Sequence, residues 1–186
     1  MPQDLAHDLW RQWPVWLVTV TLVVAAVIDG WKLKVPNWIT LPMILGGWVY
    51  SGVCFGWEGV GWSLVGTAVG LVLLLPAYSI GGMGAGDVKL LAGVGAWMWG
   101  TTTFFAFCVS AVVGGIIALG MIAVRKQWLH HFRQFIAIGT EILVIRDPNE
   151  LAAIAAERKS SMTLLPYGIP IAIGSIAYFA WTGMLL

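Results

Sequence analysis

The chain has 186 residues, of which 59% are hydrophobic and only 10% are charged, and its formal net charge is +1. Soluble domains usually have about a quarter of their residues charged, so this composition excludes an ordinary soluble globular protein. The small net charge gives no indication of a nucleic-acid partner, and two cysteines inside apolar stretches cannot build a zinc or disulfide framework.

Several apolar stretches are long enough to cross a bilayer, which takes about 20 residues of helix. We therefore expect an all-α, polytopic membrane helix bundle forming a single membrane-embedded domain over residues 1–186. The six expected transmembrane segments lie at about residues 13–28, 38–56, 60–80, 88–99, 100–124 and 162–186. The first should be an uncleaved helix, because residues 1–12 carry Asp4 and Asp8 against Arg11, whereas a signal peptide begins with basic residues.

The first segment is predicted to end at Ile28, so that Asp29 opens a polar link over residues 29–37. Gly30 and Pro36 should discourage helix across this link. A very short connection carrying Glu58 is expected between the second and third segments.

Residues 81–87 are too rich in glycine to form a stable helix interior, so a loop is expected before Val88. The apolar stretch that follows, residues 88–124, would be about 55 Å long as one helix, against about 30 Å of hydrocarbon. We predict that it breaks at Gly100 and the threonines after it. The fourth segment would then be only about 18 Å long, and its free end would need protein or water around it.

The region at about 125–161 is the one long polar stretch, and it is predicted to be a cytoplasmic amphipathic loop. Phe132 and Phe135 fall on the apolar face of a predicted helix that lies on the membrane surface. Pro148 and Glu150 after Asp147 are typical of the start of a second short helix. The alternative is a plain linker.

Lysine and arginine indicate the orientation, because cytoplasmic loops carry an excess of them. With six crossings, Arg11 lies alone on one side. The other side holds Lys32, Lys34, Lys89, Arg125, Lys126, Arg133, Arg146, Arg158 and Lys159. The N-terminus should therefore be outside, and Asp29 and Asp87 should both reach the cytoplasmic face.

Two carboxylates at one depth in a helix bundle could form a hydrolytic pair that shares one proton. Two simpler interpretations stay open: Asp87 could cap the helix that starts at Val88, and Asp29 could simply belong to the link with its two lysines. Lys89 is expected to extend towards the interface rather than act as a base. We expect no metal or cofactor, since the three histidines lie outside the apolar segments and no metal-binding motif supports them.

From about residue 25 to the C-terminus, the pattern resembles the type IV prepilin peptidase family. Members of this family are GxGD membrane aspartic proteases. The resemblance is carried by Asp29, then Lys34-Val35-Pro36-Asn37, then Gly84-Ala85-Gly86-Asp87-Val88-Lys89-Leu90, then Leu165-Pro166-Tyr167-Gly168 and a final apolar helix. It implies cleavage of the short basic leader from prepilins or pilin-like proteins at the cytoplasmic face of the inner membrane. It also implies that Asp29 and Asp87 are catalytic. The residues that it implies shape the site are Gly84, Gly86, Pro36, Asn37, Lys89, Pro166, Tyr167 and Gly168.

One departure from the family pattern concerns a second activity. Larger bacterial members carry a cysteine-rich zinc insertion near the first aspartate, and many also methylate the new pilin N-terminus. The link from Asp29 to Trp38 is too short for that insertion, so N-methylation is not carried over to this chain. The compact form is similar to the peptidases of tight-adherence (Flp-type) pili and to archaeal preflagellin peptidases.

Two alternatives belong to other classes. Intramembrane proteases of the presenilin or signal-peptide-peptidase kind pair GxGD with Tyr-Asp and Pro-Ala-Leu, whereas here Ile28 precedes Asp29 and Tyr167 follows Pro166. A small membrane transporter or structural subunit could instead use the carboxylates for ions or protons.

The charge asymmetry leads to a test of topology. Single cysteines placed at Lys34 and Ser160 should be labelled from the cytoplasmic side, and one at Glu58 from the outside, by a membrane-impermeant maleimide. Labelling of position 160 from outside would contradict the six-crossing topology.

Overall fold

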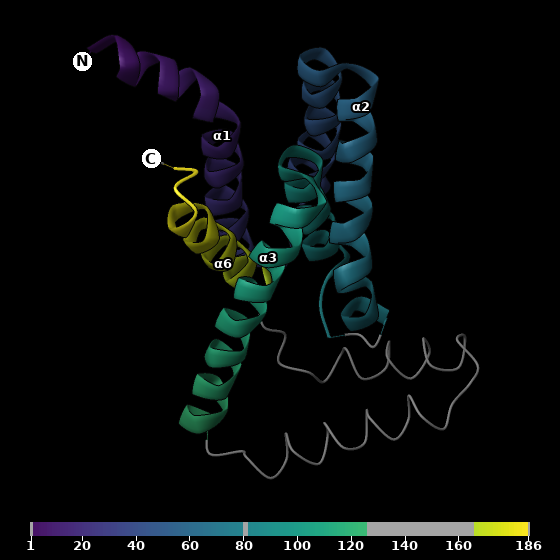
Figure 1. The fold of residues 1–186 in the computed structure, drawn as a ribbon. Coiled ribbons are helices and arrows are strands. Elements are labelled where there is room, and N and C mark those ends of the chain that lie inside the picture. The colour runs from purple at the N-terminus through teal and green to yellow at the C-terminus, as the bar shows by residue number, and fades with distance from the viewer. Residues whose placement is uncertain (1, 80–81, 126–165, 186) are drawn as a thin grey trace.

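A computed structural model describes residues 2–79, 82–125 and 166–185 of the chain. Every regular element in these ranges is helical: α1 (Pro2–Lys32), α2 (Asn37–Ser79), α3 (Ala85–Arg125) and α6 (Gly168–Trp181). Figure 1 shows α1 and α6 on one side of the molecule and α2 on the other, with α3 running between them. The all-α prediction is confirmed. The predicted polar loop lies, apart from Arg125, outside the described residues.

Three of the described helices are long and apolar enough to cross a membrane, over Gln12–Lys32, Asn37–Ser79 and Ala85–Met121. Helix α6 is apolar but has only 14 residues, about 21 Å at helical rise. The protein is thus a membrane protein by the length and composition of its helices. The six crossings and the orientation stay predictions.

Helix α2 folds back on itself at Gly56, where φ is 66° and ψ is −155°. A positive φ costs glycine little because it has no Cβ. The two halves then run side by side, and Trp48 Nε1 donates a hydrogen bond to Thr67 Oγ1 at 3.0 Å. The predicted division between the second and third segments is therefore confirmed, although the connection is shortened to Gly56 and Glu58 already lies in helix.

Helix α3 leaves helical geometry at Trp99, with φ 61° and ψ −179°, one residue before the predicted break at Gly100. The Trp99 ring packs edge-on against Phe55, with 5.4 Å between ring centroids. The prediction that this apolar stretch is divided is therefore confirmed. The half before the break lies against α2, and the half after it lies against α6.

Glycines allow α2 and α3 to approach backbone to backbone. A Cβ on Gly66 would collide with the Gly95 carbonyl oxygen, and a Cβ on Gly95 would collide with that of Gly66. One turn further along, a Cβ on Gly70 would lie 2.5 Å from the Leu91 carbonyl oxygen. Membrane helices associate by such close packing of small residues, because lipid gives them no hydrophobic drive to pair. The first half of α3 is thereby fixed on α2.

Helix α6 is held between α3 and α1. Ser110 Oγ of α3 donates to the Ile171 carbonyl oxygen at 3.3 Å, and Gly174 gives room for the Ser110 backbone. Phe105 stacks on Tyr178 with 5.9 Å between ring centroids. Helix α1 packs mainly on α6 and makes few contacts with α2 or α3. The position of α1 in the bundle therefore depends mostly on α6.

Three predicted boundaries are wrong. Helix α1 ends at Lys32 rather than Ile28, since Leu33 N still bonds to the Asp29 carbonyl oxygen at 2.8 Å and the turn ends only where Leu33 takes a φ of 50°. Helix α3 begins at Ala85, three residues before Val88. Helix α6 begins at Gly168 instead of residue 162, and residues 162–165 lie outside the described ranges.

The glycine contact between α2 and α3 can be tested by Gly95→Ala. The added methyl group would force the helices apart, at a cost of about 1–3 kcal/mol in the free energy of unfolding. Gly61→Ala is the matched control, because a Cβ there meets no atom within 4 Å. Unfolding in mixed micelles, followed by tryptophan fluorescence, should show a lower free energy of unfolding for Gly95→Ala and no decrease for Gly61→Ala. Equal stability of the two variants would contradict this account of the packing.

Candidate active site

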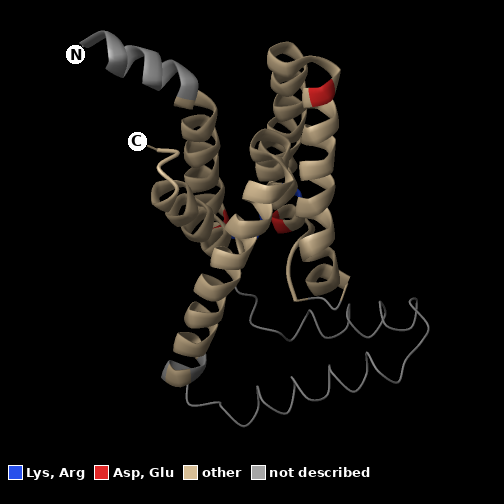
Figure 2. Cartoon of the chain, in the orientation of Figure 1, with Lys and Arg blue, Asp and Glu red and all other residues tan. Residues whose placement is uncertain are grey.

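Asp29 lies in the last turns of α1 and is 1% exposed. Its Oδ2 accepts a hydrogen bond of 2.8 Å from the backbone N–H of Gly168, at the start of α6. A Cβ on Gly168 would lie 2.9 Å from the same oxygen, so only glycine fits there without a shift. Charged positions are rare in this bundle, and Figure 2 shows them as isolated red or blue segments. A buried carboxylate in such surroundings is costly and usually functional.

Asp87 is the third residue of α3 and is 5% exposed. Its Oδ2 accepts a hydrogen bond of 3.1 Å from Gly84 N, and its own N–H donates to the Gly84 carbonyl oxygen at 3.2 Å. This is the half of a capping box in which the third helical residue reaches back to the residue before the helix. Asp87 therefore does help to cap a helix, but from inside its first turn rather than from the position before Val88.

Two consecutive residues at the start of α6, Tyr167 and Gly168, each interact with one of the aspartates. Gly168 bonds to Asp29, and the half-buried Tyr167 lies within electrostatic reach of Asp87. Burial raises the pKa of the Tyr167 phenol, and the Asp87 charge raises it further. Pro166 closes the turn that presents these two residues, since its carbonyl oxygen accepts the Ile169 N–H at 3.2 Å.

The link after α1 contacts the start of α3. A Cβ on Gly86 would collide with the Val35 carbonyl oxygen, and Lys89 Nζ donates to Asn37 Oδ1 at 3.0 Å. Pro36 directly precedes α2, and its carbonyl oxygen accepts the Ile39 N–H at 3.1 Å. Val35, which is 2% exposed, was not predicted as a site residue. An apolar residue inside a polar link was the available signal for it.

The structure therefore brings the predicted site residues into two neighbouring groups, and helix α3 contributes residues to both. The first group contains Asp29, Gly84, Asp87, Pro166, Tyr167 and Gly168. The second contains Pro36, Asn37, Gly86 and Lys89. Within the described ranges, no three His, Cys, Asp or Glu side chains gather in a way that could hold a metal ion.

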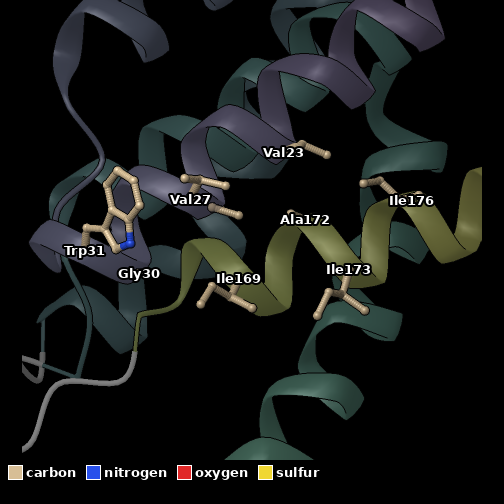
Figure 3. A pocket seen from close by; sticks show the side chains of 9 residues that line it. Val23, Val27, Gly30, Trp31, Ile169, Ala172, Ile173 and Ile176 are labelled. Atoms are coloured by element: carbon tan, nitrogen blue, oxygen red, sulfur yellow. The ribbon is translucent and has the colours of Figure 1, made fainter.

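An apolar groove of about 520 Å³ lies between α1 and α6. Figure 3 shows Val23 and Val27 of α1 along one edge and Ile169 and Ile173 of α6 along the other. Its end is formed by Gly30, Trp31 and Ile169, and Gly30 and Ile169 directly follow Asp29 and Gly168 in the sequence. The groove thus reaches the two helix ends that carry the Asp29 hydrogen bond.

A model described as the type IV leader peptidase family matches residues 16–119, more than half of the chain, and the match includes both aspartates. Prepilin leader peptidase/N-methyltransferases of Aeromonas salmonicida (strain A449) and Aeromonas hydrophila are each 30% identical over 142 residues, which is 73% of this chain and 47% and 48% of theirs. The protein of the same name from Stutzerimonas stutzeri is 29% identical over 126 residues, 63% of this chain and 43% of its own.

The chain spans about half the length of the curated relatives it matches. No solved structure matches it.

The contact between Gly168 and Asp29 can be tested by Gly168→Ala. The added methyl group would meet the carboxylate at 2.9 Å and push the start of α6 away from α1. We expect a loss of about 1–3 kcal/mol in the free energy of unfolding. Gly115→Ala is the control, because a Cβ there meets no atom within 4 Å. If micellar unfolding is unchanged in Gly168→Ala, the Asp29 bond does not hold α6 in place.

Proposed function

Because the chain belongs to the type IV leader peptidase family, we propose that it is a membrane-embedded aspartic endopeptidase that removes the short basic leader from prepilins or pilin-like proteins. The observation that carries the proposal is the placement of the two buried carboxylates. Asp29 and Asp87 belong to different helices; Asp29 accepts a hydrogen bond from Gly168, and the charge of Asp87 acts on the neighbouring Tyr167. The substrate class is inferred from the names of the relatives.

Two carboxyl groups in one site ionise singly, because like charges disfavour the second ionisation, so the pair holds one proton. The ionised carboxylate takes a proton from water as the water oxygen bonds to the scissile carbonyl carbon, and the protonated carboxyl gives its proton to the carbonyl oxygen. In the second step, a hydroxyl of the tetrahedral intermediate returns a proton to the pair. The pair protonates the leaving nitrogen as the C–N bond breaks. One proton remains on the pair.

Backbone donors orient both carboxyl groups before substrate binds. Asp29 is fixed by Gly168 N–H and Asp87 by Gly84 N–H. Catalytic groups lose efficiency rapidly when they are displaced by about 1 Å, so fixed carboxyl groups favour the proton transfers described above. Gly84 and Gly168 each donate a backbone N–H to a carboxylate oxygen. This supports the prediction that they shape the site.

For topology, we propose six crossings with the N-terminus outside and the aspartates at the cytoplasmic face of the inner membrane. Three long apolar helices support this, together with the reversal of α2 at Gly56 and the break of α3 at Trp99, which divide two of them. The excess of lysine and arginine on one side supports the orientation.

The proposal covers peptidase activity alone. The relatives' name also includes an N-methyltransferase, but they are about twice as long as this chain. The stretch from Asp29 to Trp38 contains no cysteine, so the cysteine-rich insertion expected of larger members does not occur there.

The decisive variants are Asp29→Asn and Asp87→Asn. Each amide can still accept the backbone N–H bond, so both proteins should insert and fold, but neither keeps a complete acid–base pair. Cleavage of a purified prepilin should fall by about 10²–10⁴-fold in each, as for loss of general acid–base catalysis. The double variant should be little worse than either single one, because groups that act as a unit are non-additive.

Glu58→Gln is the matched control, since Glu58 is an exposed carboxylate on α2 near the Gly56 reversal. It should cleave like the unaltered protein. Near-normal cleavage by membrane-inserted Asp87→Asn would contradict the catalytic assignment, since a capping role alone tolerates Asn about as well as Asp. A transporter or structural subunit would then become the better interpretation.

A further inference from the structure

The hydrogen bond between Lys89 and Asn37 joins residues 52 positions apart in the sequence. Lys89 lies in the second turn of α3, two residues after Asp87, and Asn37 is the first residue of α2. The donor is the ammonium of the partly buried Lys89, the acceptor is the neutral amide oxygen of the exposed Asn37, and the bond of 3.0 Å lies at the exposed surface. A bond in which one partner is charged is roughly twice as strong as one between neutral groups.

A second contact joins the same two segments. Val35 is buried against Gly86, where even a methyl group would collide with the Val35 carbonyl oxygen. Residues 33–37, called here the 33–37 link, therefore touch α3 on both sides of Asp87, at Gly86 before it and at Lys89 after it. The position of Asp87 relative to this link is fixed at two points.

The other end of the 33–37 link is attached to Asp29. Leu33 N donates to the Asp29 carbonyl oxygen at 2.8 Å and takes a φ of 50°, so the link leaves α1 directly from the turn that carries the aspartate. Helix α1 makes few direct contacts with α2 and α3, and its packing reaches α3 mainly through α6. The 33–37 link adds a direct connection from the turn that carries Asp29 to the residues on both sides of Asp87.

We propose that Lys89 and Asn37 are positioning residues for the aspartate pair, and that their hydrogen bond holds the first turns of α3 against the 33–37 link. This inference rests on the proposed function, because it assigns the bond a role in the same peptidase reaction. The Lys89 ammonium donates its hydrogen bond to Asn37, at the start of α2. Its role is to hold the helix that carries Asp87, and the chemistry belongs to the aspartates.

The experiment is a double-mutant cycle with Lys89→Met and Asn37→Ala in the full-length protein, with prepilin cleavage as the readout. Lys89→Met keeps most of the aliphatic stem and removes the ammonium. Each single variant should lower kcat by roughly 10–100-fold, the scale of a misplaced catalytic group, and leave KM within about threefold. The double variant should be no slower than the slower single one, because both changes break one bond.

Two further variants separate positioning from charge and from folding. Asn37→Asp keeps an oxygen acceptor for Lys89 and should retain kcat within about threefold of the unaltered protein. Lys32→Met removes a positive charge from the exposed last turn of α1 and should leave kcat unchanged. The unfolding of every variant in micelles is measured alongside. A lower kcat then counts as a positioning effect only in a variant that is still folded.

Three results would overturn the proposal: additive losses in the cycle, a loss in Lys89→Met without one in Asn37→Ala, or an equal loss in Lys32→Met. The last two would indicate that Lys89 acts through its charge or through lipid phosphate. The aspartate variants distinguish a failure of the proposed peptidase function from a failure of the positioning role. If Asp29→Asn and Asp87→Asn abolish cleavage while the cycle shows no loss, only the positioning role is wrong.

Discussion

A carboxylate buried among apolar helices must find a hydrogen-bond donor within the protein, because neither lipid nor the apolar core supplies one. Asp29 and Asp87 meet this requirement through backbone N–H groups at the ends of helices, from Gly168 and Gly84. Helix starts have such donors available because their first N–H groups lack partners within the helix. The site therefore forms where three helix ends meet.

Glycine makes this meeting possible in two ways. At Gly86 and Gly168 the absence of a side chain lets neighbouring backbone or carboxylate approach to contact distance. At Gly66 and Gly95 it lets α2 and α3 touch backbone to backbone, which fixes the first half of α3 and with it Asp87. Small residues thus serve both the packing of the bundle and the geometry of the site. A methyl group at Gly66 or Gly95 would push two helices apart, whereas one at Gly86 or Gly168 would displace the segments next to the aspartates.

Among the described helices, α2 and α3 pack most extensively on each other, and α6 joins α3 to α1. The α2–α3 pair carries Asp87, whereas α1 carries Asp29 and packs mainly on α6. Helix α6 packs on both α1 and α3, and the Gly168 bond to Asp29 and the contacts of the 33–37 link with α3 add local connections between the two parts. Residues of both segments were part of the family resemblance in the sequence.

The amino-acid sequence by itself determined the apolar helices, the reversal between residues 56 and 60, the break near Gly100 and the two aspartates as candidates, because these depend on local composition and segment length. Only the tertiary structure decided that Gly168 bonds to Asp29, that Val35 lies on Gly86 and that Lys89 reaches Asn37. Such contacts join residues far apart in the chain, and their distances follow from how helices pack, which no local pattern records. The same reason explains the extension of α1 past Asp29, where contact with α6 stabilises a turn that Gly30 alone would have weakened.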